Sequence, residues 1–340
     1  MRKTLFSVGL IAISCCNSAV GGIFQRDSTV KFKVIDFDGN PISNANVCVS
    51  TFKKWIPGDN FGTSIDMDIQ GNTDTNGEVS VSFLCKSLQF SYVVKAIGYY
   101  GEGSYKDINS SKAQSDIKFA RAGSGFTLRQ TQFETNLVVR LKPIVNPTPM
   151  YVQNLKPYSG RYKSIPEKAL SGVWGYDIKT GDWTEPYGKG KDVDFFVEYS
   201  YEHFHKDRIV DCALVFTNNV HDGFYIAKNS GTFFCSDYVA NTNATYTKRL
   251  DFGSWGKKYK GNYATDLLDD NEYIVLRTRT KCDQDGRIVS AHYAKIYGPI
   301  CFNGGFAHNG SYFNPNENDP NLEADTTVNL LPGGGKGFAP

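Results

Sequence analysis

The sequence is poor in several residue types and has no strong charge of one sign. It has three methionines and five histidines in 340 residues, with 37 basic and 35 acidic residues. Removing an N-terminal leader that contains Arg2 and Lys3 lowers the basic count to 35, which gives a formal net charge of zero. A nucleic-acid-binding protein is expected to carry a basic excess or a basic stripe, so the composition argues against nucleic acid as a partner.

Beyond the N-terminus the sequence also lacks an apolar run long enough to cross a bilayer as a helix. The N-terminus itself has Arg2 and Lys3 followed by a short apolar stretch from Leu5 to Ile13. This pattern is typical of a bacterial secretory signal, which we predict over residues 1–22.

The end of this signal, Ala12-Ile13-Ser14-Cys15, resembles a lipobox, in which the cysteine thiol carries a diacylglycerol. An ordinary cleavage site near Ala19 or Gly21 is the alternative. We expect an exported protein attached to a membrane through a lipid on Cys15, either on the outer membrane or cell surface or in the periplasm.

No Cys-x-x-Cys spacing occurs, which argues against a zinc site of that type. Six cysteines remain after the signal, and an even number in an exported chain favours disulfides. We predict the pair Cys48–Cys85 because both residues fall in the first predicted domain. Proximity in the sequence favours the two other pairs, Cys212–Cys235 and Cys282–Cys301.

Convincing helical periodicity is missing as well, whereas aromatic residues make up 14% of the chain and glycine contributes 33 residues. This profile indicates short strands joined by turns. Val30, Phe32 and Val34 alternate with lysines, as expected for a strand with one buried face. We predict an all-β protein with a sandwich over 28–142, a linker or strap over 143–165, a larger sandwich or jelly-roll-like domain over 166–330 and a mobile tail over 331–340.

The first domain carries a family resemblance. The segments VKFKVIDFDGNPISNANVCVSTF, TDTNGEVSVSF and SYVVKAIGYY follow one another between residues 30 and 100. Together they resemble the carboxypeptidase regulatory-like, or transthyretin-like, β-sandwich. The resemblance implies an immunoglobulin-like sandwich that serves as a spacer, anchor or accessory module, and it transfers no catalytic residues. The sequence departs from the family in a long insert between Thr51 and Gly71 and in the cysteines at 48 and 85.

A candidate metal site lies at the end of a predicted strand. His203, His205 and Asp207 are two residues apart, so their side chains share one face, and their types suit a metal ion. Histidines at the rim of a sandwich that bond to the backbone are the alternative. We favour that alternative and expect no cofactor.

The acids Asp194, Glu198 and Glu202 share the opposite face of the same predicted strand. Neighbouring members are four residues apart, about 13 Å along a strand, which is too far for a pair of glycosidase carboxylates. We therefore expect them to lie on a solvated outer face.

An aromatic set is the remaining candidate for recognition. Trp174, Tyr176, Trp183 and Tyr187 lie in or beside a turn-rich segment. Exposed rings of this kind bind sugars or proteins, so we predict ligand binding here. The alternative is that the rings plug the end of the second sandwich.

These observations predict a non-enzymatic envelope protein. Its first sandwich would be a stalk, and its second domain would recognise an envelope glycan or protein. Two alternatives stay open, namely an extracellular hydrolase of glycan or peptide with its site in the second domain, and a structural subunit of an envelope assembly.

Overall fold

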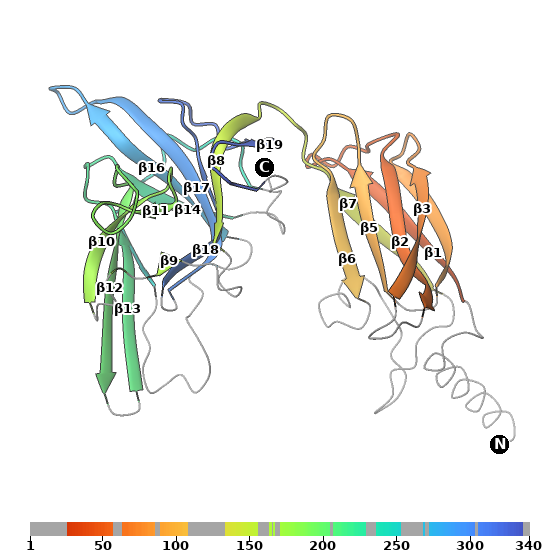
Figure 1. Cartoon of the computed structure of the whole chain (residues 1–340). Coiled ribbons are helices and arrows are strands. Elements are labelled where there is room, and N and C mark those ends of the chain that lie inside the picture. Colours follow the sequence, from red (N-terminus) through yellow and green to blue (C-terminus); the bar gives the residue numbers. More distant parts are fainter. Residues whose placement is uncertain are drawn as a thin grey trace, which may run out of the picture. The chain divides into compact units, whose positions relative to one another are not determined.

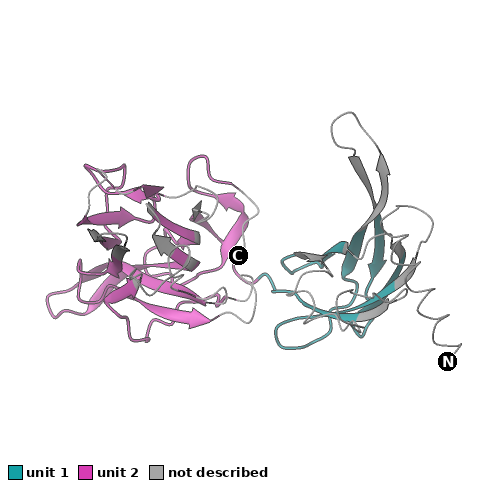
Figure 2. Cartoon of the chain, turned by 90° about the horizontal axis from the view of Figure 1, so that it is seen from below, with its two compact units in different colours: residues 1–144 teal, residues 145–340 magenta. Residues whose placement is uncertain are grey.

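The computed structural model describes residues 26–56, 63–85, 89–107, 133–155, 163–164, 166, 171–204, 207–228, 236–252, 268, 272–302 and 305–335. The predicted signal and Cys15 lie outside these residues. The chain divides into two compact units, Met1–Ile144 and Val145–Pro340 (Figure 2). Among the described residues, no helix is long and apolar enough to cross a membrane.

Two sheets, one mixed and one antiparallel, form the first unit (Figure 1). One sheet has the order β4-β1-β7, in which β1 is antiparallel to β4 and parallel to β7. The other has the order β3-β2-β5-β6 and is antiparallel. The strands are β1 (Arg26–Ile35), β2 (Asn46–Ile56), β3 (Thr63–Asn72), β4 (Glu78–Cys85), β5 (Gln89–Lys95), β6 (Glu102–Asp107) and β7 (Phe133–Arg140).

Alternation along the strands builds the core of the first unit. The side chains of Val30, Phe32 and Val34 are buried, as predicted, in a cluster that includes residues of β2 and β5. The turn before β4 needs glycine, because Gly77 has φ +74° and a Cβ there would lie 2.4 Å from the carbonyl oxygen of Val34. The alternating sequence pattern thus predicts this core.

The second unit is a larger sandwich of a five-stranded and a seven-stranded sheet (Figure 1). The first sheet has the order β11-β10-β12-β13-β15, and the second has β14-β16-β17-β18-β8-β19 with β9 beside β18. The strands are β8 (Thr148–Leu155), β9 (Lys163–Ser164), β10 (Ser171–Asp177), β11 (Asp182–Trp183), β12 (Phe195–Phe204), β13 (Asp207–Val215), β14 (Gly223–Lys228), β15 (Arg249–Phe252), β16 (Glu272–Cys282), β17 (Ile288–Phe302), β18 (Gly305–Phe313) and β19 (Ala324–Asn329).

Apolar residues of both sheets meet between them, where Phe195, Leu214, Leu276 and Phe306 are buried. A second buried cluster includes Tyr273. Its residues in β16, β17 and β18 lie on the opposite face of the sheet from those of the first cluster. The seven-stranded sheet is therefore buried on both faces at its centre, whereas the apolar residues of the five-stranded sheet gather on its inner face.

The all-β fold class is confirmed. The segment 143–165, predicted as a linker or strap, contains β8, which pairs antiparallel with β18 and parallel with β19. This part of the chain is thus a strand of the second sandwich, because its apolar residues Met150 and Val152 join the second cluster. The predicted tail lies after β19, and residues 336–340 are outside the described residues.

Candidate functional site

The aromatic set predicted to bind a ligand is largely part of the core. The exposed fractions of Trp174, Tyr176 and Trp183 are 5%, 0% and 3%. Trp174 and Tyr176 share the inner face of β10, and the ring of Tyr176 lies 5.0 Å from that of Phe306 in the opposite sheet. The prediction that these three residues form a recognition surface is wrong, because their side chains are buried and plug the sandwich. Tyr187 alone is exposed, at 43%.

The acids around this segment also differ from the prediction. Asp194 was expected on a solvated face, but its exposed fraction is 0%. It precedes the first residue of β12, and its carboxylate accepts hydrogen bonds from the Ile178 amide at 2.8 Å and from the Thr278 hydroxyl at 2.9 Å. The strand's alternation does not extend to Asp194, which explains the error.

Arg279 joins three carboxylates in what we call the inner cluster: Arg279, Asp177, Asp192 and Asp194. The guanidinium lies 2.8 Å from Asp177, 2.9 Å from Asp192 and 2.8 Å from Asp194. Burial by itself lowers the pKa of Arg279, but its hydrogen bond and ion pair with Asp194 more than offset this, so the pKa is raised. The guanidinium also lies over the ring of Phe313, 4.6 Å from its centre.

The inner cluster fixes the segment between β10 and β12. Asp177 accepts backbone hydrogen bonds from Lys179 at 2.9 Å and from Lys191 at 3.0 Å, so it also closes turns on either side of β11. Because both carboxylate oxygens of Asp177 and of Asp194 accept hydrogen bonds from the chain itself, the buried part of the cluster acts as an internal brace.

The metal candidate falls partly outside the described residues. His203 lies near the end of β12 and Asp207 begins β13, whereas His205 lies in the undescribed connection between them. The register pairs His203 with Arg208. Among the side chains that the structure does describe, no group of three histidines, cysteines or acids is placed to hold a metal ion. The His203, His205 and Asp207 site therefore stays a prediction.

The predicted pair Cys48–Cys85 is wrong. Cys48 is a free thiol, and it lies between the core residues Val47 and Val49 of β2. Because neighbouring residues of a strand point to opposite faces, the thiol of Cys48 points away from the core and away from the sheet that contains Cys85.

The predicted pair Cys282–Cys301 is wrong as well, and Cys282 is a free thiol. Cys282 faces Ile288 at one end of the β16–β17 hairpin, and Cys301 lies near the other end of β17. Thirteen residues of strand span roughly 40 Å, whereas the Cα atoms of a disulfide lie about 6 Å apart. Cys212 is also a free, buried thiol, and its predicted partner Cys235 lies outside the described residues. Burial raises the pKa of Cys212 to about 12, which keeps it protonated and unreactive.

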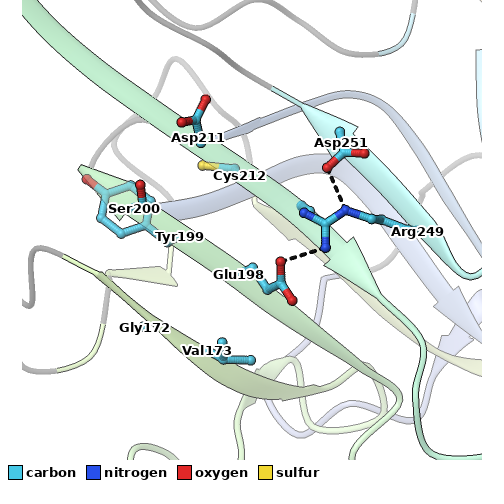
Figure 3. Close-up of a pocket in the computed structure, with 10 residues that line it drawn as sticks. Gly172, Val173, Glu198, Tyr199, Ser200, Asp211, Cys212, Arg249 and Asp251 are labelled. Carbon is cyan, nitrogen blue, oxygen red and sulfur yellow. Dashed lines mark hydrogen bonds and ion pairs between the residues drawn. The ribbon is translucent and has the colours of Figure 1, made fainter. Parts of the chain in front are cut away.

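A depression lies on the five-stranded sheet, and we call it the outer hollow (Figure 3). Its volume is about 690 Å³. The strands β10, β12, β13 and β15 each contribute side chains that point away from the core. Three rows cross the sheet on this face: Ser171, Ser200 and Asp211; then Val173, Glu198, Ala213 and Asp251; then Gly175, Phe196, Val215 and Arg249.

The outer hollow has a small side chain at its centre and charged side chains around it. Ala213 lies between Glu198 and Asp251 in the middle row, and its short side chain is covered, with 1% exposed. Arg249 reaches from the next row and donates to Glu198 at 2.6 Å and to Asp251 at 2.7 Å (Figure 3). These hydrogen bonds raise the pKa of Arg249.

The charged side chains of the outer hollow stay accessible to solvent. The exposed side-chain fractions are 48% for Arg249, 38% for Glu198 and 70% for Asp251. The prediction that Glu198 lies on an outer face is thus confirmed. The sequence did not single out Arg249, because residues 51 positions apart become neighbours only through the strand order. The alternation of Arg249 and Asp251 along the sequence is a signal that could have indicated a shared face.

Comparisons with known proteins define no family. No protein-family model matches the chain, and no curated protein matches it. Among solved structures, hydroxyquinol 1,2-dioxygenase from Pseudomonas putida DLL-E4 is 11% identical over 36% of this chain and 58% of its own, with a TM-score of 0.26. An intradiol ring-cleavage dioxygenase from Tetranychus urticae is 16% identical over 37% of this chain and 85% of its own, with a TM-score of 0.23.

A third solved structure, a streptococcal ancillary pilin, spans more of the chain. It is 13% identical over 67% of this chain and 58% of its own, with a TM-score of 0.19. TM-scores this low support no functional argument. The fold itself defines the class of the molecule, which is a protein built from two β-sandwich units.

Proposed function

We propose that this chain is an exported, non-enzymatic envelope protein whose second sandwich binds a glycan or protein partner. The observation that carries the proposal is the outer hollow. It combines a depression of about 690 Å³ with exposed charged side chains on the outer face of a sheet. Exposed surfaces of this kind suit a macromolecular partner, whereas small-molecule sites usually enclose most of the ligand.

The first unit fits the role of a stalk. It has its own core, which includes Val30 and Phe90, and it forms a compact unit that ends at Ile144. Its sequence resembles transthyretin-like modules, which serve as spacers or accessory domains. The predicted secretory signal and the lipobox-like sequence at Cys15 support export and attachment to the membrane through a lipid.

A bulky residue in the outer hollow tests the proposal. Val173 and Val289 are matched exposed valines of the second unit, with exposed fractions of 57% and 58%. Only Val173 contributes to the outer hollow. Tryptophan is well tolerated in strands, so each substitution changes one exposed surface and leaves the core intact.

The experiment measures saturable binding of the purified mature chain to the envelope fraction of its source cells. We expect Val173→Trp to weaken binding at least tenfold and Val289→Trp to leave it unchanged. Equal binding by the two variants and the unaltered chain would refute the proposal, provided that both variants melt like the unaltered chain. Absence of saturable binding by the unaltered chain would refute it as well.

A further inference from the structure

We propose that the outer hollow binds an extended, basic segment of a protein partner, with lysine or arginine at alternate positions. This inference rests on the proposed function and adds the chemistry of the partner. It follows from the charge of the hollow, from the spacing of its carboxylates and from the side chains that line its centre.

The charge of the outer hollow is negative. Three carboxylates, Glu198, Asp211 and Asp251, and one guanidinium, Arg249, give it a formal charge of −2. Arg249 occupies one oxygen of Glu198 and one oxygen of Asp251. Asp211 is exposed, and it forms no hydrogen bond or ion pair with the described part of the chain. A cationic partner would therefore gain new ion pairs here without displacing Arg249.

The carboxylates lie in two neighbouring rows of the sheet. Asp211 belongs to the row of Ser200, and Glu198 and Asp251 flank Ala213 in the next row. Rows on one face are two residues apart along a strand, or about 7 Å. In an extended peptide, side chains at positions i and i+2 also lie on one face at this spacing. A segment that runs along β13 can therefore place two successive basic side chains over the two rows.

The lining favours a peptide over a neutral glycan. Sugar sites commonly stack the sugar on an exposed aromatic ring. Tyr199 contributes to the hollow's lining, but it belongs to the residues of β12 that face the core. Its ring centre lies 6.4 Å from that of Trp174 in the core. Val173 in the same row as Ala213 is 57% exposed and offers apolar surface that an extended peptide can contact.

Fluorescence anisotropy with a labelled peptide tests this inference. The probe is a short peptide with lysine at every second position, and its control is the same peptide with acetylated lysines. We expect the mature chain to bind the lysine peptide at low salt, more weakly at high salt, and the acetylated peptide not at all. Asp211→Asn should weaken binding about threefold, as expected for one exposed ion pair. The double variant D211N/D251N should weaken it at least tenfold.

A matched control separates the hollow from general attraction. Asp285 is an exposed aspartate in the β16–β17 turn, with a side chain that is 71% exposed. We expect Asp285→Asn to bind the lysine peptide like the unaltered chain. If D285N loses as much affinity as D211N, or if the acetylated peptide binds as well as the lysine peptide, the inference is overturned.

The two proposals fail in different ways. If the lysine peptide does not bind but Val173→Trp still weakens binding to the envelope fraction, the basic segment is ruled out and the recognition function stands. The same holds if a neutral glycan on an array binds at the hollow. If the envelope fraction is not bound either, the recognition function is refuted together with this inference.

Discussion

The second sandwich contains two clusters in which an arginine bridges carboxylates, and they differ in burial. In the inner cluster, Arg279 is 15% exposed, and its partners Asp177 and Asp194 are 2% and 0% exposed. In the outer hollow, Arg249 is 48% exposed and lies between partners that are 38% and 70% exposed. The same pair of residue types thus occurs in two different dielectric environments.

This difference separates a structural cluster from a candidate for recognition. A buried carboxylate that loses its counter-charge has no water to replace it, so the inner cluster holds its segment in one conformation. An exposed pair exchanges its partner for water or for a ligand at little cost. The outer hollow can therefore bind and release charged groups, whereas the inner cluster braces the fold.

The largest effect is expected from removing the arginine of the inner cluster. Arg279→Met leaves Asp177 and Asp194 buried without a counter-charge, which should lower the free energy of unfolding by about 3–5 kcal/mol. Chemical denaturation of the full chain measures this loss. Arg287→Met is the control, because Arg287 is 79% exposed in the same hairpin and should change stability by less than about 0.5 kcal/mol. Equal stability of the two variants would contradict the bracing role.

A buried titratable group should give the next largest effect. His308 is fully buried, and neither ring nitrogen forms a hydrogen bond with another side chain or backbone group in the described part of the chain. Burial lowers the pKa of His308 from 6.5 to about 3 in the folded protein. Below pH 6.5 the unfolded chain therefore binds a proton that the folded chain does not. The stability contributed by the neutral imidazole is present above pH 6.5 and is lost progressively as the pH falls to about 3.

The slope of this loss reaches about 1.4 kcal/mol for each pH unit. Chemical denaturation at a series of pH values between 4 and 7 measures this slope. We expect the unfolded state to bind about 1 proton more than the folded state. His308→Leu has no group to titrate, so its stability should depend less on pH over this range. An identical pH dependence in the variant and the unaltered chain would show that His308 stays accessible to protons.

Local patterns predicted much of the fold but little of either cluster. The alternation of Val30, Phe32 and Val34 and the outward position of Glu198 depend only on neighbouring residues in one strand. Asp194 was misplaced because its environment depends on Arg279, which is 85 residues away in the sequence. The pairing of Arg249 with Glu198 depends in the same way on the strand order β12-β13-β15.

The aromatic set shows the same limit. Trp174 and Tyr176 have the same parity in β10, so a strand over these residues would have predicted that both rings share a face. Their burial follows from Phe195 and Phe306, which lie on other strands and pack against Tyr176. An aromatic-rich segment with many turn residues therefore does not by itself distinguish a binding surface from a plug.

The smallest effect on stability is expected from removing the arginine of the outer hollow. Arg249→Met leaves exposed carboxylates that water can solvate, so we expect the free energy of unfolding to change by about 0.5 kcal/mol or less. Loss of the guanidinium also makes the hollow more negative, so the lysine peptide should bind more tightly to this variant. Denaturation and anisotropy on the same preparation measure both quantities. A loss of stability as large as that of Arg279→Met would remove the distinction between the two clusters, and weaker peptide binding would show that Arg249 itself contacts the partner.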